Sequence, residues 1–307
     1  MRITVFTPTY NRAHTLLNLY TSLVNQTYHD FEWLIIDDGS SDNTQQIVEE
    51  WIQQGNHFQI RYYKQPNGGK HRAINKGVQL SNSELFFIVD SDDQLTSNAL
   101  SVIAAQVDDI SSDSNIKFAG VCGCRGYSST QIIGTTFTGK TLDCTCLERS
   151  KYGISGDKAE VFYTNILRKY PFPEYDGENF VTECVVWDKI ASDGYCMRYF
   201  NEIIYLCEYL EDGLTHQGLS LYYRNPNGYG HYLRMCRDNH KFSFGLSAYY
   251  DAECYYHWKN MMSAQEIAKL IGTNTIHLLF ISYALQIRKL LSKLKKLALN
   301  ILRGKSS

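Results

Sequence analysis

The apolar run Leu85-Phe86-Phe87-Ile88-Val89 is followed at once by Asp90-Ser91-Asp92-Asp93, and this junction decides the predicted fold. Short apolar runs rich in aromatic and β-branched residues are typical of buried parallel strands. In open α/β sheets, ligands bind outside the carboxyl ends of the strands. Three carboxylates within four residues repel one another and are costly to hold together without a cation. The junction therefore predicts a strand that ends at a site for a metal ion and a diphosphate.

A second junction of the same kind lies upstream, where Phe31-Glu32-Trp33-Leu34-Ile35-Ile36 precedes Asp37-Asp38-Gly39-Ser40. Strand patterns also cover residues 3–6 and 59–64, and apolar residues at helical spacing follow each strand. Alternating strands and helices imply a mostly parallel sheet with helices on both faces. We therefore expect an α/β fold with a Rossmann-like sheet.

The pattern along the chain predicts three regions. Residues 1–113 alternate strand and helix, whereas residues 114–212 carry short strands and glycine-rich turns, including 118–121 and 132–138. Residues 213–307 have the pattern of tyrosine-rich helices that end in a basic tail. We expect a domain of two halves over residues 1–212 and a helical extension after it.

Composition predicts an ordinary soluble protein of 307 residues, with 44% hydrophobic and 20% charged residues. The nine cysteines form no disulfide framework, so we expect reduced thiols in the cytoplasm. The pairs Cys122/Cys124 and Cys144/Cys146 have two interpretations, zinc ligands or buried strand residues, and strand alternation favours the second. The N-terminal apolar stretch is too short for a signal peptide, and no run reaches the length of a membrane-spanning helix.

The tail carries basic charge that no acidic residue balances. The last 24 residues hold seven basic residues and no acidic one, while the rest of the chain holds 23 basic and 32 acidic residues. Leucines at helical spacing accompany these charges, which is typical of a basic amphipathic helix on an anionic membrane surface. The alternative is a solvated helix that packs on the protein itself. We expect peripheral attachment to the cytosolic face of a membrane and no nucleic-acid partner.

Four motifs in the first hundred residues identify a family. They are Thr7-Pro8-Thr9-Tyr10-Asn11-Arg12, Asp37-Asp38-Gly39-Ser40-Ser41-Asp42, Asn67-Gly68-Gly69-Lys70 and Asp90-Ser91-Asp92-Asp93. In this order and spacing, the sequence resembles the family 2 glycosyltransferases, which have a GT-A nucleotide-sugar-binding fold. The resemblance implies a hexosyl- or hexosaminyltransferase that moves a sugar from a UDP-sugar to a glycan or lipid-linked acceptor, with inversion, in surface polysaccharide synthesis. It also implies that residues 1–113 bind the nucleotide and residues 114–212 the acceptor.

The resemblance assigns the nucleotide-sugar to Pro8, Thr9, Tyr10, Arg12, Asp37, Asp38, Gly69, Lys70, Asp90 and Ser91. Among these residues, Asp38 would accept the imide N–H of uracil, and Asp90 would reach the ribose. The alternative role of Asp37 and Asp38 is turn formation and helix capping, but Asp42 already suits capping. For Arg72, just beyond the glycine motif, a donor contact and a plain structural role are equally favoured.

Asp92 and Asp93 are the predicted ligands of Mg²⁺ or Mn²⁺, and the sequence does not tell which is closer to the metal. Hard divalent ions take few carboxylates and fill their other positions with water and phosphate oxygens. The cation would neutralise the UDP leaving group. By the same resemblance, His216 is a weaker candidate for an additional ligand, because a lone histidine in a loop is usually not one.

Transfer with inversion also needs a general base that takes a proton from the acceptor hydroxyl. Resembling enzymes place it in an acidic motif at a helix start, and Glu183 is the best match here, although Cys184 replaces the second acid. Glu178 and Asp188 are fallback bases, and a first-turn acid favoured by the helix dipole is the alternative role of Glu183. Asp157 is a further candidate near the sugar or acceptor.

Residues 134–141 match the phosphate-loop pattern G-x-x-x-x-G-K-[ST], but their β-forming residues favour a hairpin. Two other functions stay open. A sugar nucleotidyltransferase would need a glycine-rich basic loop after the first strand, which residues 7–12 lack. A catalytically inactive sugar- or nucleotide-sugar-binding module would share the fold and is compatible with Cys184.

Overall fold

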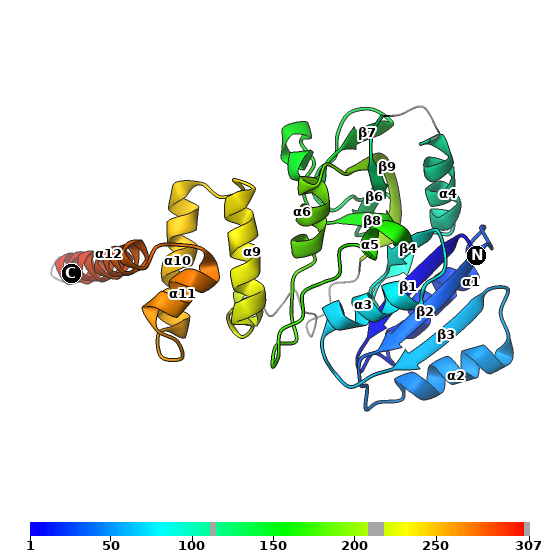
Figure 1. Ribbon diagram of the computed structural model, residues 1–307, viewed down its shortest axis with the longest axis horizontal. Coiled ribbons are helices and arrows are strands. Elements are labelled where there is room, and N and C mark those ends of the chain that lie inside the picture. The colour runs from blue at the N-terminus through cyan, green and yellow to red at the C-terminus, as the bar shows by residue number, and fades with distance from the viewer. Residues whose placement is uncertain (111–114, 208–217, 304–307) are drawn as a thin grey trace. The chain divides into compact units, whose positions relative to one another are not determined.

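The computed structural model describes residues 1–110, 115–207 and 218–303 (Figure 1). The chain divides into two compact units, Met1–Gln217 and Gly218–Ser307. The boundary predicted after residue 212 lies outside the described residues.

The first unit is built on a nine-stranded mixed sheet with the order β3-β2-β1-β4-β8-β6-β9-β5, and β7 pairs with β9. Its parallel part contains the four strands predicted in the first half, which are β1 (Ile3–Thr9), β2 (Phe31–Asp37), β3 (Gln59–Lys64) and β4 (Leu85–Ile88). β1 and β2 are fully buried, as expected for strands covered on both faces.

The rest of the sheet is mostly antiparallel. It contains β5 (Gln94–Leu95), β6 (Phe118–Gly126), β7 (Thr141–Cys144), β8 (Lys158–Tyr163) and β9 (Cys196–Leu206). β8 runs antiparallel to β4, with Leu85 opposite Tyr163. Because of this register, β8 begins at the edge of the sheet where β4 ends.

Helices cover both faces of the sheet, as predicted. They are α1 (Leu16–Val24), α2 (Thr44–Gln54), α3 (Lys70–Leu80), α4 (Ala99–Asp109), α5 (Thr164–Leu167), α6 (Cys184–Ser192) and the 3-10 helix η1 (Cys146–Tyr152). On one face, Trp33 stacks with Tyr20 of α1 and Trp51 of α2. On the other face, Phe6 meets α3 so closely that a Cβ on Gly77 would lie 2.2 Å from its ring.

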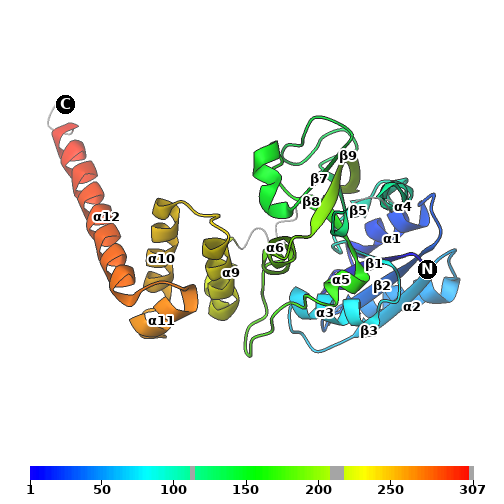
Figure 2. The ribbon, with the colours of Figure 1, turned by 45° about the horizontal axis from the view of Figure 1, so that its top comes forward.

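The second unit is helical, as predicted. It contains α8 (Leu219–Tyr223), α9 (Pro226–Asp238), α10 (Phe244–Trp258), α11 (Ala264–Ile271) and α12 (Thr275–Arg303) (Figure 2). Its small core centres on Leu233, Trp258, Ile267 and Leu278. Among the described residues, no single helix has the length and hydropathy needed to cross a bilayer. Only α11 and residues Thr275–Arg288, bent by 101°, pass that test as a pair.

Two predictions for the middle of the chain have different outcomes. The phosphate-loop match opens no helix, but the hairpin expected there, and the strand over 132–138, are wrong. Residues 132–138 form only isolated bridges, and β7 pairs with β9 instead. All nine cysteines are free, and Cys122, Cys124 and Cys144 are buried in β6 and β7, as the strand interpretation predicts.

Candidate active site

The predicted site residues come together at one edge of the sheet. Thr9 and Asp37 end β1 and β2 opposite each other, and the backbone N–H of Asp38 donates to Thr9 O at 2.8 Å. Asp90 follows β4 by two residues, and β4 pairs with β1 on its other side. Parallel strands therefore bring the motifs after β1, β2 and β4 together, as the sequence predicts.

The loop after β1 is tied to the loop after β2. Asn11 has a φ of 53° and accepts a hydrogen bond from the backbone N–H of Ser41 at 2.8 Å. The backbone N–H of Ala13 donates to Asp42 at 3.0 Å, and Asp42 also accepts from the backbone N–H of Thr44 at the start of α2. Asp42 thus accepts a backbone N–H at the start of α2, although the N-cap residue is Asn43.

The predicted donor contacts at the end of β1 and in the loop after it differ in exposure. Tyr10 is 49% exposed, Arg12 is half-buried, and Pro8 is buried. Thr9 Oγ1 is buried and has no hydrogen-bond partner among the described residues.

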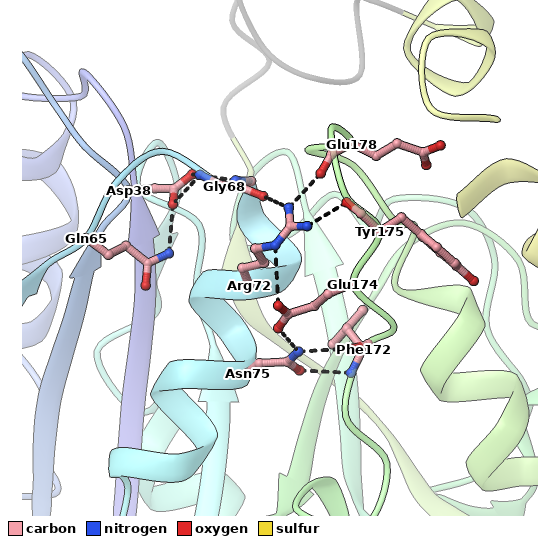
Figure 3. A network of polar contacts seen from close by, with 10 residues as sticks. Asp38, Gln65, Gly68, Arg72, Asn75, Phe172, Glu174, Tyr175 and Glu178 are labelled. Atoms are coloured by element: carbon pink, nitrogen blue, oxygen red, sulfur yellow. Dashed lines mark hydrogen bonds and ion pairs between the residues drawn. The ribbon is translucent and has the colours of Figure 1, made fainter. Parts of the chain in front are cut away.

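Asp37 and Asp38 hold this edge together. The Asp37 carboxylate is fully buried and accepts from the backbone N–H of Ser40 at 2.6 Å and from the Tyr62 hydroxyl. Asp38 accepts from the backbone N–H groups of Gly68, at 3.0 Å, and Gly69, at 2.7 Å (Figure 3). Both carboxylates therefore shape the loops of the site, and their predicted contact with the nucleotide stays a prediction.

Gly69, the N-cap of α3, occupies a position that only glycine suits. Its φ is 94°, and a Cβ there would lie 1.8 Å from the backbone oxygen of Asn179. Two distant segments of the chain thus touch through their backbones at the start of α3.

Lys70, the first residue of α3, links the acidic cluster to the predicted base. Its ammonium nitrogen lies 2.6 Å from Asp90 Oδ1 and 2.8 Å from Glu183 Oε1. All three side chains are partly exposed, from 24% for Lys70 to 34% for Glu183. Burial opposes the charge on Lys70, but Asp90 and Glu183 outweigh it and raise the pKa of its ammonium. Burial likewise opposes ionisation of Asp90, but Lys70 and Arg125 lower its pKa.

Two residues that the sequence does not predict as part of the site, Tyr205 and Arg125, lie beside the acidic cluster of residues 90–93. The Tyr205 hydroxyl accepts from the backbone N–H of Asp90 at 2.9 Å and donates to Asp93 Oδ2 at 2.7 Å. The guanidinium of Arg125 lies 4.2 Å from the centre of the Tyr205 ring. Tyr205 and Arg125 come from β9 and β6 and belong to no motif, so only the pairing of those strands reveals their role.

Asp92 and Asp93 differ in how they fit a metal ion. Asp93 is buried and bonded to Tyr205, whereas Asp92 is only partly buried. Burial and the neighbouring Asp90 charge raise the pKa of Asp92, which is the strain that a bound cation relieves. Among the described residues, no group of three or more His, Cys, Asp or Glu side chains is arranged to hold a metal. Asp92 is therefore the more accessible carboxylate of the two, and metal binding by Asp92 and Asp93 stays a prediction.

The remaining candidates are less central. Asp157 is exposed just before β8, at the edge where β4 ends. Asp188 is buried within α6 and accepts from the Cys146 thiol, and the Glu178 carboxylate is also buried. His216 lies outside the described residues. Of the acids predicted as bases, Glu183 is the one paired with Lys70 beside the acidic cluster.

Comparisons of the sequence with known proteins match parts of the chain. Residues 4–143 match the model of the glycosyl transferase family 2. The chain is 32% identical over 111 residues to the glycosyltransferase GlyG of Streptococcus pneumoniae, covering 36% of each chain. It is 30% identical over 195 residues, 61% of this chain and 58% of the other, to the GalNAc(5)-diNAcBac-PP-undecaprenol beta-1,3-glucosyltransferase of Campylobacter jejuni. The chain thus spans between about a third and three-fifths of these two relatives.

Solved structures confirm the predicted GT-A fold. Residues 1–349 of TarS from Staphylococcus aureus, in complex with UDP-GlcNAc, superpose with a TM-score of 0.60 at 22% identity, over 85% of this chain and 73% of that one. The mannosyltransferase PcManGT of Pyrobaculum calidifontis, in complex with GDP-Man and Mn²⁺, gives a TM-score of 0.52 at 18% identity, over 97% and 80%.

Proposed function

Since residues 4–143 of this chain match the model of the glycosyl transferase family 2, we propose that the protein is a metal-dependent, inverting glycosyltransferase that uses a UDP-sugar. The observation that carries the proposal is the position of Lys70, in contact with both Asp90 of the acidic cluster and Glu183. The contact of one cation with both an acidic-cluster carboxylate and the predicted base supports a site in which the two act on the same sugar.

On the donor side, the edge formed by the loops after β1, β2 and β4 would hold the nucleotide. Tyr10 is exposed enough to meet a base, and the buried Thr9 hydroxyl has a hydrogen bond left to make. Lys70 would meet the diphosphate, because an ammonium held between two carboxylates can exchange one of them for a phosphate oxygen. The UDP-GlcNAc complex of TarS, which shares this fold, supports UDP as the nucleotide.

Asp92 would hold Mn²⁺ or Mg²⁺, in keeping with the Mn²⁺ named for PcManGT. The bound ion would stabilise the negative charge that develops on the departing UDP. Asp93 would contribute indirectly, because its bond to Tyr205 fixes the turn that presents Asp92.

On the acceptor side, Glu183 would take the proton from the attacking hydroxyl. Its carboxylate contacts the Lys70 ammonium. If the diphosphate draws Lys70 away, the carboxylate becomes free to accept the proton. A single displacement of this kind inverts the configuration at the anomeric carbon.

The relatives support a glycan or lipid-linked acceptor in the synthesis of surface polysaccharides. The Campylobacter jejuni relative is named for a PP-undecaprenol-linked glycan, and TarS of Staphylococcus aureus is named for poly(ribitol-phosphate). An acceptor carried on a membrane lipid requires the enzyme to work close to the bilayer.

Attachment to an anionic membrane through the C-terminal helix is part of this proposal. The described part of α12 carries a row of apolar residues spaced three or four apart and 41% to 79% exposed, namely Ile276, Leu279, Phe280, Tyr283, Ile287 and Leu291. Residues 288–305 supply the seven basic residues of the tail. An exposed apolar row with basic residues is the pattern of a helix that lies in the membrane interface.

The experiment that tests the catalytic proposal is a screen for UDP release across a panel of UDP-sugars, with Mn²⁺ and then with EDTA. We expect slow hydrolysis of one donor in the absence of acceptor, abolished by EDTA. UDP binding without release from any UDP-sugar would contradict turnover of these donors and favour an inactive binding module. Absence of UDP binding would contradict the whole assignment of the site.

A further inference from the structure

Arg72 connects the loop before α3, residues 65–69, which we call the glycine loop, to the segment that leads to Glu183. It lies on α3, two residues after Lys70, and its guanidinium donates to three backbone carbonyls (Figure 3). These are Gly68 O at 2.6 Å, Glu178 O at 2.6 Å and Tyr175 O at 2.7 Å. The first lies in the glycine loop, and the other two lie in residues 172–183, which we call the connecting segment.

A second set of bonds holds the beginning of the connecting segment. Asn75, one turn further along α3, donates to Phe172 O at 2.9 Å and accepts from the backbone N–H of Phe172 at 2.8 Å. It also donates to the Glu174 carboxylate, which lies 3.4 Å from Arg72 Nε (Figure 3). Side chains of α3 thus bond to the beginning and the middle of the connecting segment.

The glycine loop and the connecting segment, which Arg72 connects, differ in the other bonds that hold them. The glycine loop is also held by Asp38, which accepts from the backbone N–H groups of Gly68 and Gly69, and by Asn67, which donates to Asp38 O. The connecting segment has no regular secondary structure, and Arg72 and Asn75 bond it to α3. Loss of Arg72 should therefore loosen the connecting segment, while Asp38 still holds the glycine loop.

We propose that Arg72 is a positioning residue that fixes the position of Glu183 for proton transfer, because it ties the connecting segment to the glycine loop. The inference rests on the proposed function of Glu183 as base. Arginine suits the role because its planar guanidinium offers five N–H donors in a fixed geometry, whereas lysine offers a single ammonium. This connection makes the acceptor side of the site depend on the element that carries Lys70.

The test is Arg72→Lys, examined in two ways. Hydrogen exchange of the amides of residues 172–183 reports on this connection without any need for catalysis, and we expect faster exchange at Phe172 and Glu178. Turnover reports on Glu183, and we expect kcat to fall between about 10-fold and 100-fold, as small misplacements of a reacting group do. The Kd for UDP should change by less than about 3-fold, because Asp38 still holds the glycine loop.

Two further variants serve as a control and as a replacement for Arg72→Lys. Arg168→Lys is the matched control, because Arg168 also donates to a distant backbone carbonyl, that of Ser81, and should alter neither readout. Asn75→Ala loosens the beginning of the segment and replaces Arg72→Lys if that variant does not fold. Unchanged exchange, or faster exchange with unchanged kcat, would overturn the proposal. If the wild-type protein transfers no sugar, the proposed function fails, and the exchange result still decides whether Arg72 holds the segment.

Discussion

Lys70 Nζ lies 2.8 Å from Glu183 Oε1, so the cation nearest the acidic cluster is also bonded to the predicted base. The same nitrogen lies 2.6 Å from Asp90 Oδ1. This bridge joins two regions of the sequence that no local pattern connects. It makes Lys70 the point at which donor binding can influence the base.

Lys70→Met keeps most of the stem and removes the charge. We expect the variant to lose about 2 kcal/mol of unfolding free energy at neutral pH, because two partly buried carboxylates lose a charged partner. Lys70 lowers the pKa of Asp90, and a lowered carboxyl pKa gives stability above the unfolded-state pKa that disappears as the pH falls. The difference from the wild type should therefore shrink below about pH 4.

Denaturant unfolding across pH measures this difference. The control is Lys151→Met, which removes an exposed pair with Glu148 and should alter stability little. A difference that is the same at neutral pH and at low pH would contradict the role given to the ion pairs.

Asp92→Asn should separate metal binding from stability. Burial and Asp90 raise the pKa of Asp92, so its ionised form costs stability once the pH rises above the unfolded-state value. In metal-free buffer at neutral pH, the variant should unfold at a temperature equal to or above that of the wild type. Mn²⁺ should raise the melting temperature of the wild type in the presence of UDP and not that of the variant.

Asp93→Asn should affect stability more than the response to Mn²⁺, the reverse of Asp92→Asn, because Asp93 accepts a bond from Tyr205 in a buried position. We expect it to lower stability by about 1–2 kcal/mol while leaving part of the response to Mn²⁺. Equal responses of the two variants to Mn²⁺ would contradict the preference for Asp92.

Gly69→Ala tests the contact between α3 and the connecting segment. The new Cβ would lie 1.8 Å from Asn179 O, at a φ of 94°. Gly55→Ala is the matched control, since Gly55 also has a positive φ, 74°, but nothing lies within 4 Å of the new Cβ. The control should cost about 1 kcal/mol of backbone strain, and Gly69→Ala clearly more, together with lost turnover. Equal costs for the two variants, measured by denaturant unfolding, would contradict the close approach.

The membrane proposal predicts that both parts of α12 contribute to binding. Phe280→Ser combined with Ile287→Ser, and separately deletion of residues 288–307, should each weaken sedimentation with phosphatidylglycerol-containing vesicles. The control is Met261→Ser, an equally exposed apolar residue outside α12. The deletion should also remove the salt dependence of binding. Unaltered binding of both α12 variants would contradict the proposal, as would a change confined to self-association in the ultracentrifuge.

The sequence predicts the first half of the fold closely, because its strands are continuous apolar runs. β3 covers the predicted residues 59–64, and β1 and β2 extend their predicted ranges by only a few residues. The second half was less predictable, since residues 132–138 favour a strand locally but form only isolated bridges. Local propensity does not tell which strand a β-forming segment will pair with.

For the candidate site, the motifs locate the edge of the sheet but not the contacts within it. Asp38 could be placed there from sequence, but its bonds to Gly68 and Gly69 could not. Tyr205 and Arg125 carry no signal of their own, because their role arises from the position of β9 and β6 beside the acidic cluster.

The most direct test of the account is the turnover of Glu183→Gln with the donor identified in the UDP-release screen. The substitution keeps the size of the side chain and removes the base, so we expect kcat to fall by about 10²- to 10⁴-fold. The Kd for UDP should stay within about 3-fold of the wild-type value, and Glu202→Gln, an exposed glutamate on β9, should behave as the wild type. Turnover of Glu183→Gln at the wild-type rate would contradict the account, because the bridge from Lys70 would then end at a residue with no part in the reaction.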